Sequence, residues 1–424
     1  MRLFGMKEKH GTLLKNTVML TILQLSTYLL ALITIPYQTR VLGPEVYGVL
    51  GVATAVMVYF NLIIDFGFLL SATSSVSANR DNKEHLCKVL TCVTAGKMIL
   101  ALISVAVLFV LCALIPSWHS KSDIFILFFI STLMTSLMPD YLYRGMEKMT
   151  AITIRTVCIR AFFTVAIFIL LKGPEDIYVV PVLNIIGNGA AMLTSYIDLY
   201  KRFNIRFCKI NLGEIFQHVK SSAFFFFSRI ATTAYTALNT VILDIIAQGG
   251  AVTGYYTSAD KLITTGRNLL SPISDSLYPY MVRHKDFKAV RKILLLLMPP
   301  IILFCGVCFI WAEPICKLLL GAEYGPAGNV LRAMLPVAVV TLPNYILGFP
   351  TLGAMGLSKH ANYSVIFGSA LHIFNLIILF LTNNVNMLSL AILVSVAECA
   401  VLIYRVVVIV KNRNIMKSAE GSNE

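Results

Sequence analysis

Charged residues are scarce in this sequence. Only 13% of its 424 residues are Asp, Glu, Lys or Arg, whereas 57% are hydrophobic and the mean hydropathy is +0.78. Soluble domains are nearer one quarter charged. The composition therefore excludes an ordinary soluble domain and predicts a chain that crosses a membrane many times. The first apolar run is long enough to span and lacks a small-residue cleavage site, so we expect it to be retained.

Motifs for catalysis and cofactor binding are missing as well. The sequence has no phosphate-binding P-loop, no G-x-S-x-G and no His/Glu motif with metal spacing. Its nine cysteines form no disulfide or zinc framework, and Cys305-x-x-Cys308 lies inside an apolar run, where small core residues are expected. The sequence therefore predicts neither an enzyme nor a cofactor or metal. Any transport would draw its energy from an ion gradient or from the gradient of the substrate.

Acidic residues are outnumbered, 21 against 35 Lys and Arg, which gives a net charge of +14. The excess lies in short segments between apolar runs and forms no basic face, so nucleic acid is not a predicted partner. These cations occupy every second gap, and the alternate gaps hold only Arg40, Lys121, Lys172 and Lys317. Because short cytoplasmic loops are rich in Lys and Arg, this pattern predicts an even number of spans with both termini in the cytoplasm.

Apolar segments of about 20 residues predict an all-α polytopic membrane protein with twelve transmembrane helices. The predicted spans cover residues 15–37, 46–71, 88–115, 123–144, 150–171, 177–199, 221–247, 251–281, 292–313, 328–353, 361–382 and 387–409. The longest gap is basic and follows the sixth span. We therefore predict a six-helix bundle over residues 1–200, a cytoplasmic linker at 201–219 and a second six-helix bundle over 220–424, as in transporters built from parallel repeats.

A weak internal repeat supports this division. Gly43 and Gly48 recur as Gly249 and Gly254 at a constant offset of 206 residues, each pair in the first outer loop of its half. Helix interruptions are predicted in two later spans, at Pro299–Pro300 and at Gly348, Pro350 and Gly353.

Five cations lie within apolar runs, where a charge costs roughly 2.5–3.5 kcal/mol. They are the candidate substrate-binding residues Lys97, Arg160, Arg229, Lys261 and Arg267, together with the neighbouring Asn268. At 1.5 Å per residue, the first four lie near the midplane. The alternatives are that Lys97 extends toward the cytoplasm and that Arg160 pairs with an acid of a neighbouring helix.

The acids are placed differently along the spans, most of them toward the ends. The candidates for coupling or gating are Asp65, Asp140, Asp244, Asp260 and Asp275. Only Asp260 and Glu398 lie near mid-depth, so simple ion pairing is not expected. Asp260 either neutralises Lys261 or Arg267 or carries a proton or ion.

Polar residues follow one helical face in the seventh and eighth spans. The seventh carries Arg229, Thr232, Thr233, Thr236 and Thr240; the eighth carries Thr257, Ser258, Lys261, Thr264, Thr265, Asn268, Ser271 and Asp275. Such a face contacts either protein or a water-filled cavity. Hydrogen bonds between helices would account for the threonines, whereas the charged run of the eighth span favours a cavity.

The sequence contains a set of short motifs, most of them in the first two spans: Lys15-Asn16, Pro36-Tyr37, TRVLGPE at 39–45, Tyr47-Gly48, Asp65-Phe66-Gly67, Ser71-Ala72-Thr73, FFFFSRIATTAYTALNTVIL, TGYYTSADKL and LGAEY at 320–324. These motifs resemble those of bacterial O-antigen and polysaccharide-repeat-unit flippases of the Wzx type. This family belongs to the superfamily that also contains multidrug exporters of the MATE type and lipid II flippases. The family often has a basic residue after the Ser-Ala-Thr motif, where this chain has Ser74-Ser75.

The resemblance implies a MATE-like fold of two six-helix bundles around a central cavity in the bacterial inner membrane. It implies a flippase that moves undecaprenyl-pyrophosphate-linked oligosaccharide from the cytoplasmic to the periplasmic leaflet by alternating access. A polysaccharide polymerase and a chain-length regulator are further expected partners. The mid-depth cations agree with an anionic substrate, since Arg and Lys both bind phosphate.

Two alternatives stay open at this point. One is an ion-coupled exporter of small molecules from the same superfamily, although a transporter of cationic drugs would need acids rather than bases at mid-depth. The other is a membrane-embedded glycan polymerase or glycosyltransferase, which usually carries a large extramembrane loop or a nucleotide-sugar site; the sequence contains neither.

Overall fold

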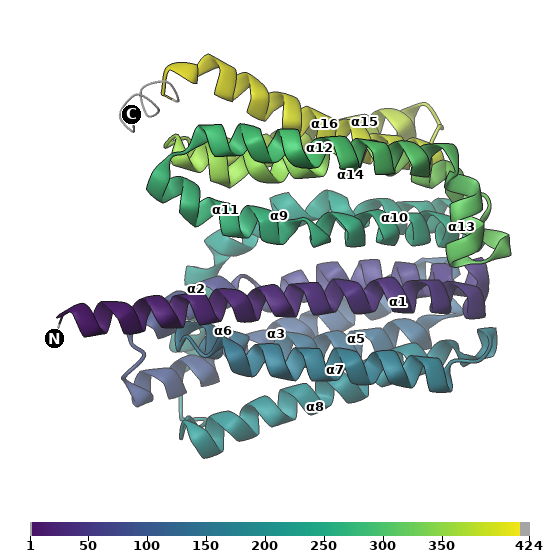
Figure 1. The fold of residues 1–424 in the computed structure, drawn as a ribbon. Helices are drawn as coiled ribbons and strands as arrows, with labels where there is room; N and C mark the ends of the chain where they lie inside the picture. Colours follow the sequence, from purple (N-terminus) through teal and green to yellow (C-terminus); the bar gives the residue numbers. More distant parts are fainter. Residues whose placement is uncertain (1, 416–424) are drawn as a thin grey trace. The chain divides into compact units, whose positions relative to one another are not determined.

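The computed structural model describes residues 2–415, except for the side chains of residues 2–18, 20, 227, 228, 231–236 and 279. Within that range the chain forms helices joined by short turns and no strand (Figure 1), so the all-helical prediction is confirmed. The elements are α1 (Arg2–Asp65), α2 (Phe68–Ala78), α3 (Lys83–Leu114), α4 (Pro116–His119), α5 (Ser122–Leu137), α6 (Asp140–Gly145), α7 (Met149–Leu170), η1 (Pro174–Tyr178), α8 (Val179–Arg202), α9 (Leu212–Ala247), α10 (Ala251–Leu269), α11 (Ser271–His284), α12 (Phe287–Ile310), α13 (Ala312–Leu320), η2 (Ala322–Tyr324), α14 (Ala327–Ile346), η3 (Leu347–Gly353), α15 (Ser358–Leu381) and α16 (Met387–Lys411).

Packing divides the chain into two compact units. Unit 1 takes in the chain up to Thr34 and Val52–Thr233, and unit 2 takes in Ile35–Gly51 and the chain from Ala234 onward. The helices α1 and α9 therefore contribute residues to both units. The division expected from the sequence, at 201–219, concerns the transmembrane bundles and stays a prediction.

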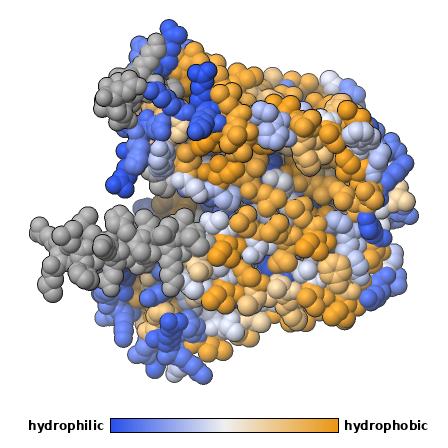
Figure 2. All heavy atoms as spheres, in the orientation of Figure 1, coloured by the Kyte–Doolittle hydropathy of each residue, from blue (hydrophilic) through white to orange (hydrophobic). Residues whose placement is uncertain are grey.

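Nine of the described helical segments are long and apolar enough to cross a membrane. They are Thr21–Ala78, Lys83–Leu114, Ser122–Gly145, Met149–Leu170, Pro174–Arg202, Phe287–Ile310, Ala327–Gly353, Ser358–Leu381 and Met387–Lys411. Figure 2 shows hydrophobic side chains over the middle of the helices and hydrophilic ones gathered near their ends. The prediction of a multi-pass membrane protein is confirmed.

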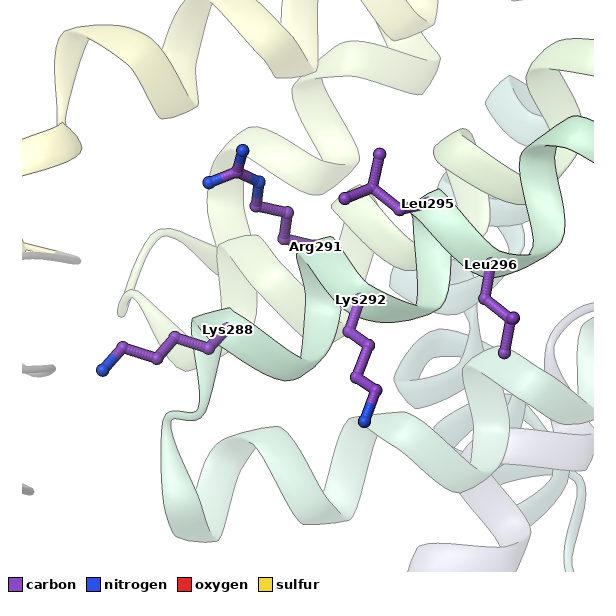
Figure 3. A pocket seen from close by; sticks show the side chains of 5 residues that line it. All are labelled: Lys288, Arg291, Lys292, Leu295 and Leu296. Carbon is purple, nitrogen blue, oxygen red and sulfur yellow. The ribbon is translucent and has the colours of Figure 1, made fainter.

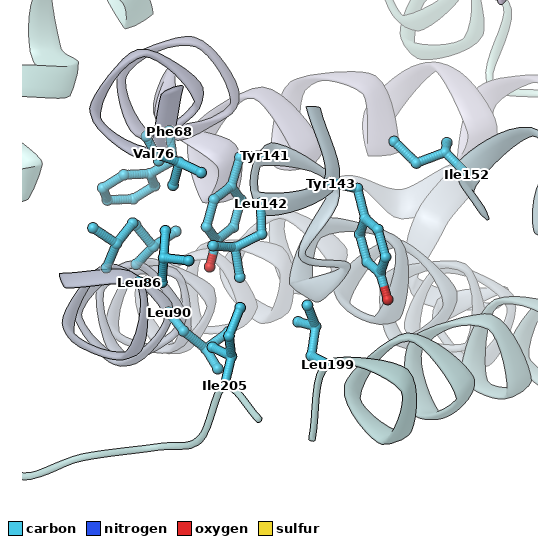
Figure 4. Close-up of a cluster of buried hydrophobic side chains, with 13 residues drawn as sticks. Phe68, Val76, Leu86, Leu90, Tyr141, Leu142, Tyr143, Ile152, Leu199 and Ile205 are labelled. Atoms are coloured by element: carbon cyan, nitrogen blue, oxygen red, sulfur yellow. The ribbon is translucent and has the colours of Figure 1, made fainter. Parts of the chain in front are cut away.

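Each unit has an apolar core of its own. In unit 1, Phe68 and Val76 of α2 pack with Leu86 and Leu90 of α3 and with Leu142 of α6 (Figure 4). A second cluster joins α11, α12 and α14 in unit 2. Lys97, one of the charged side chains described below, lies on α3 and so on a helix of the first core.

The long helix α1 is broken at its middle and turns sharply at its end. Gly43 has a φ of 70° and a ψ of 169°, outside the helical region, and Pro44 follows it as the first residue of the second half. At the end of α1, Phe66 and Gly67 both have positive φ, 40° and 78°. A Cβ at Gly67 would lie 2.8 Å from the carbonyl oxygen of Ser222 in α9, so only glycine permits this close approach.

One glycine of each pair in the internal repeat, Gly48 and Gly254, lies against the other in unit 2. A Cβ at Gly48 would lie 2.9 Å from the carbonyl oxygen of Gly250, and a Cβ at Gly254 would lie 1.8 Å from that of Pro44. Pro44 and Gly250 are related by the same offset of 206 residues as Gly48 and Gly254. The contact is therefore reciprocal, as at a two-fold axis, and it supports the internal repeat.

The two predicted helix interruptions have different outcomes. The backbone leaves the helical region at Gly348, where ψ is −122°, inside the π-helical segment η3. That interruption is confirmed. In contrast, α12 continues through Pro299 and Pro300, so the interruption predicted there is wrong.

Asp286 caps the amino end of α12, and its removal provides a first prediction. Its carboxylate accepts hydrogen bonds from the backbone N–H of Ala289, at 3.0 Å, and from the Tyr280 hydroxyl, also at 3.0 Å. The bond from Ala289, followed by the smaller effect of Tyr280, lowers the pKa of Asp286. We expect Asp286→Ala to destabilise the protein by about 1 kcal/mol, whereas Asp286→Asn keeps the cap.

The stabilisation by Asp286 is expected to depend on pH. Because its folded-state pKa is lowered, the contribution is present above the unfolded pKa of about 3.9 and is lost as the pH falls through the folded value. Thermal unfolding of the detergent-solubilised protein should show the gap between wild type and Asp286→Ala at pH 7 and its decline below about pH 4. A gap that persists unchanged in acid would contradict the ionised cap.

Candidate functional site

A cluster of three charged residues in unit 1 brings together three predicted site residues. Asp65, at the end of α1, accepts from Lys97 of α3 and from Arg229 of α9, with N–O distances of 3.1 Å and 3.0 Å. The Lys97 side chain is 4% exposed and that of Arg229 is 38% exposed. Two cations thus share one carboxylate, and Arg229 is the member that solvent can reach. We call these three residues the Asp65 cluster.

Neighbouring groups hold the buried end of the Asp65 cluster. The Lys97 ammonium donates to the carbonyl oxygen of Ser136 at 2.7 Å and lies 5.6 Å from the centre of the Tyr141 ring. The Ser136 hydroxyl in turn donates to the Asn61 side chain at 2.7 Å. Lys97 is therefore fixed by a carboxylate, a carbonyl and a π-face, which together compensate for burying its charge.

The turn after Asp65 attaches the cluster to α9. The Phe66 ring stacks on that of Phe226 with a centroid distance of 4.3 Å, and the Ser71 and Ser222 hydroxyls are 2.6 Å apart. These contacts lie on either side of Gly67, where the backbones of the two segments come closest. Residues of the Asp-Phe-Gly and Ser-Ala-Thr motifs thus contact α9, the helix that carries Arg229, close to Asp65.

The expectation that simple ion pairing would be absent is wrong. Lys97 and Arg229 pair with Asp65, and in unit 2 the Arg267 guanidinium lies 2.6 Å from the carboxylate of Glu398. The estimate of depth used Cα positions, whereas the long stems of Lys and Arg carry the charge well away from Cα. Acids placed nearer the helix ends are therefore within reach.

The pair of Arg267 and Glu398 belongs to a buried polar group in unit 2. Glu398, on α16, is 5% exposed, and it also accepts from the Asn344 side chain at 3.2 Å. Nearby, the Asn239 amide donates to the Tyr256 hydroxyl at 3.1 Å and its oxygen lies 3.0 Å from His372 Nε2. These bonds join α9, α10, α14, α15 and α16 within the unit.

Lys261 and Asp260 lie on α10 and are not joined to this group by an ion pair. The Lys261 ammonium lies 4.8 Å from the centre of the Tyr47 ring, a cation–π contact with the second half of α1. No described cation lies within 4.0 Å of the Asp260 carboxylate. Among the described residues, therefore, no ion pair supports the interpretation that Asp260 neutralises Lys261 or Arg267. Its role in coupling stays a prediction.

The other predicted site residues lie apart from these groups. Arg160 is exposed on α7, and Asp275 is exposed on α11. Asp140 pairs with Arg155 at 2.6 Å, and Asp244 is buried near the end of α9. Asn268 is half-buried at the end of α10, where its backbone carbonyl accepts from Ser271. Their roles in binding or gating stay predictions.

The polar stripe of the eighth span is divided between two environments. Thr257, Ser258 and Thr265 are buried, whereas Thr264 is exposed and Lys261 is half-buried. The buried side of the stripe packs on the second half of α1 within unit 2, since a Cβ at Gly51 would lie 2.5 Å from the Thr257 side chain. In the seventh span, Thr240 is buried, and the side chains of Thr232, Thr233 and Thr236 lie outside the described residues.

Two arginines that the sequence analysis did not single out are largely shielded from solvent, Arg155 and Arg405. The Arg155 side chain is 12% exposed and bonds to Ser195 and Asp140. Arg405 is 8% exposed and donates to the Ser364 hydroxyl at 2.9 Å and to the Asn344 carbonyl. The sequence did contain a signal for the burial of Arg405. That residue lies within the apolar run LIYRVVVIV, six residues before the next cation.

Comparison with known proteins finds both a family and structural relatives. Residues 13–285 match the family described as "Polysaccharide biosynthesis protein". A protein of Escherichia coli K12 named "Putative O-antigen transporter" is 25% identical over 397 residues, which are 92% of this chain and 95% of that protein. A protein of Shigella dysenteriae with the same name is 27% identical over 365 residues, covering 85% and 91% of the two chains.

Solved structures show the same fold at low sequence identity. The lipid II flippase MurJ in an inward closed conformation superposes with a TM-score of 0.67 at 14% identity, over 95% of this chain and 90% of that one. An inward-facing multidrug resistance transporter of the MATE family also gives 0.67, at 12% identity, over 95% and 100%. The family match covers more than half of the chain. The chain therefore belongs to the polysaccharide biosynthesis protein family, and its resemblance to flippases of the Wzx type is confirmed.

Proposed function

We propose that the protein is a flippase that translocates undecaprenyl-pyrophosphate-linked oligosaccharide from the cytoplasmic to the periplasmic leaflet by alternating access. The observation that carries this proposal is the Asp65 cluster, in which two cations share one carboxylate and the more exposed cation is an arginine. The relatives named as O-antigen transporters support the choice of a polysaccharide substrate.

The Asp65 cluster suits the anionic part of such a substrate. Its net charge of about +1 attracts a pyrophosphate or an acidic sugar, and a guanidinium can bind phosphate through two parallel N–H bonds. Arg229 is the group that contacts the substrate. Lys97, at 3% exposure, is too buried for direct contact and acts by holding Asp65 in position. In unit 2, Lys261 is a second accessible cation. No carboxylate among the described residues forms an ion pair with it.

We also propose the twelve spans and the orientation expected from the sequence. The segment Thr21–Ala78 has 58 residues, roughly 87 Å at the helical rise, and the break at Gly43 divides it into two spans. The 36-residue helix α9 and the pair α10 and α11 supply two more beyond the nine apolar segments. Both termini would lie in the cytoplasm of an inner membrane, with a polymerase and a chain-length regulator as partners.

Neutralising two accessible cations tests the function. In a strain that depends on this gene, we expect the double variant Arg229→Gln, Lys261→Gln to lower the amount of surface polysaccharide at least tenfold. The reason is that each charge-assisted bond to phosphate contributes about 1.5–3 kcal/mol. The measurement is lipopolysaccharide or capsule on gels, together with the amount of protein in the membrane fraction.

A matched control removes the same charge elsewhere. Lys359 and Lys411 are exposed at helix ends, and Lys359→Gln, Lys411→Gln should leave the surface polysaccharide unchanged. Normal polysaccharide in the Arg229 and Lys261 double variant, with the protein present at the wild-type level, would exclude the proposed substrate contacts. Resistance to toxic cations conferred by the wild-type chain would instead indicate a small-molecule exporter.

A further inference from the structure

A groove between α7 and α8 in unit 1 contains no residue to which the proposed transport step assigns a role. Its volume is about 420 Å³, and the described side chains that line it come from α6, α7 and α8. Figure 1 shows α7 and α8 side by side. By contrast, the described side chains that line the hollow at the start of α12 all belong to that one helix (Figure 3). The groove has walls from three helices, so their packing fixes its shape.

Short side chains leave space between α7 and α8. The lining includes Ala151 of α7 and Ala190, Ala191 and Thr194 of α8. Ala190 and Thr194 are exposed, and they lie one helical turn apart, at i and i+4. An apolar chain can therefore lie between the two helices without displacing a large side chain.

Both walls of the groove change from polar to apolar in the same direction. Because η1 makes a short connection, α7 and α8 run antiparallel and the end of α8 lies beside the start of α7. At that end the groove is lined by Arg155 of α7 and by Asp198 and Arg202 of α8. Further along, it is lined by Ile159, about 6 Å beyond Arg155, and by Ala190, about 12 Å beyond Asp198 at the helical rise. The groove therefore suits an amphipathic ligand.

The polar end offers charges of both signs. The Arg155 side chain is 12% exposed and is held in the wall by the Asp140 carboxylate, at 2.6 Å. One carboxylate oxygen of Asp198, Oδ2, accepts from the Tyr143 hydroxyl at 2.8 Å. Arg202, four residues further along α8, is exposed. A ligand at this end thus meets a carboxylate oriented by Tyr143 and an accessible guanidinium.

The surroundings of the groove are apolar and exposed. Ile154 and Leu193 are each 59% exposed, and Ile197 is 51% exposed. The segments Met149–Leu170 and Pro174–Arg202 are long and apolar enough to span a membrane. Lipid therefore surrounds this side of α7 and α8, and a membrane lipid is the amphipathic molecule at hand.

We propose that this groove binds phosphatidylethanolamine, whose headgroup carries a phosphate and a primary ammonium. The phosphate contacts the Arg202 guanidinium, the ammonium donates to the Asp198 carboxylate, and one acyl chain lies along Ile159 and Ala190. A guanidinium presents planar N–H donors to phosphate oxygens, and a primary ammonium has three N–H donors. The proposal goes beyond transport, since it does not depend on the identity of the substrate.

Two other phospholipids complement the polar end only in part. Phosphatidylcholine has the same phosphate, but its quaternary ammonium has no N–H to donate to Asp198. Phosphatidylglycerol has the phosphate without any cation, so its negative charge would lie beside that of Asp198. The groove should therefore distinguish among three lipids that share the same acyl chains.

Native mass spectrometry of the full-length protein tests the proposal. The protein is purified in detergent, mixed with equal concentrations of the three lipids, and examined for retained lipid. We expect the wild type to retain phosphatidylethanolamine about tenfold more than phosphatidylcholine, because a charge-assisted hydrogen bond is gained. Equal retention of these two lipids, or a preference for phosphatidylglycerol, would overturn the proposal.

The variant Asp198→Asn tests the contact with the ammonium. The amide oxygen still accepts from Tyr143, whereas the negative charge is gone. We expect retention of phosphatidylethanolamine to fall about tenfold, to the level of phosphatidylcholine. As a matched control, Glu175→Gln removes an exposed carboxylate of η1, at the other end of α8, and should keep the preference. An unchanged preference in Asp198→Asn, or an equal loss in both variants, would contradict the site.

The variant Arg202→Gln tests the contact with the phosphate. It should lower the retention of phosphatidylethanolamine and phosphatidylcholine alike, since both lipids carry the phosphate. The neighbouring Lys201 is exposed and is not among the residues that line the groove, so Lys201→Gln should retain both lipids. Equal retention in the two variants would rule out the phosphate contact.

Filling the apolar end separates a bound lipid from a bound headgroup. Ala190→Phe should lower the retention of phosphatidylethanolamine, whereas Leu193→Phe, at an exposed position outside the lining, should not. Because Ala190 and Arg202 are exposed, these variants test the site even where Asp198→Asn impairs folding. Soluble phosphoethanolamine should not displace the lipid at equal concentration. Displacement, or full retention in Ala190→Phe, would show that no acyl chain occupies the groove and would overturn the proposal.

Discussion

Gly254→Ala is expected to destabilise the protein by about 3 kcal/mol or more, because the added methyl group has no space. A Cβ at this position would lie 1.8 Å from the carbonyl oxygen of Pro44, and the atom it meets is backbone rather than a flexible side chain. The start of α10 and the second half of α1 would have to separate. The measurement is the thermal unfolding of the purified protein in one detergent, with its yield from membranes.

The same helix offers a matched control for this substitution. A Cβ at Gly266 would meet no atom within 4 Å, and Gly266 lies within α10. Gly266→Ala should therefore leave the melting temperature unchanged or raise it slightly, since alanine favours a helix by up to about 1 kcal/mol over glycine. Equal melting temperatures for the two alanine variants would mean that the helices do not approach as closely as described.

Asp65→Ala should be the most disruptive of the charge substitutions. It leaves Lys97, which is 3% exposed, without its carboxylate, so that the Ser136 carbonyl and the Tyr141 ring remain beside a buried charge. Removing one partner of a buried pair costs about 3–5 kcal/mol. Arg229 is 38% exposed and can turn toward water, so most of the cost arises at Lys97. The expected result is a large fall in the melting temperature together with loss of surface polysaccharide.

A double-mutant cycle separates this buried pair from a general effect of charge. Lys97→Met combined with Asp65→Asn removes both charges, and the double variant should be more stable than the sum of the single variants implies. Additive effects of these two substitutions would contradict direct pairing of Lys97 with Asp65. As a control for charge alone, Asp275→Ala removes an exposed carboxylate and should change the free energy of unfolding by no more than about 0.5 kcal/mol.

The sequence-based prediction was most successful where it depended on local pattern. Long apolar runs led to the helices, and charges inside those runs led to Lys97, Arg229 and Arg267, because a cation surrounded by apolar residues stands out without any knowledge of the fold. The resemblance carried by the first two spans led to the family. Depth along a helix was a poorer guide, and it failed to predict the partners of these cations.

The sequence by itself therefore determined the helical, membrane-spanning class, the family and most of the buried charges. Only the tertiary structure decided that Asp65 pairs with both Lys97 and Arg229, that Gly48 and Gly254 meet reciprocally, and that Arg405 is buried. Hydrophobicity and helical spacing are properties of neighbouring residues in the chain. Which helices become neighbours, and how far a lysine or arginine reaches between them, depends on packing between segments distant in sequence.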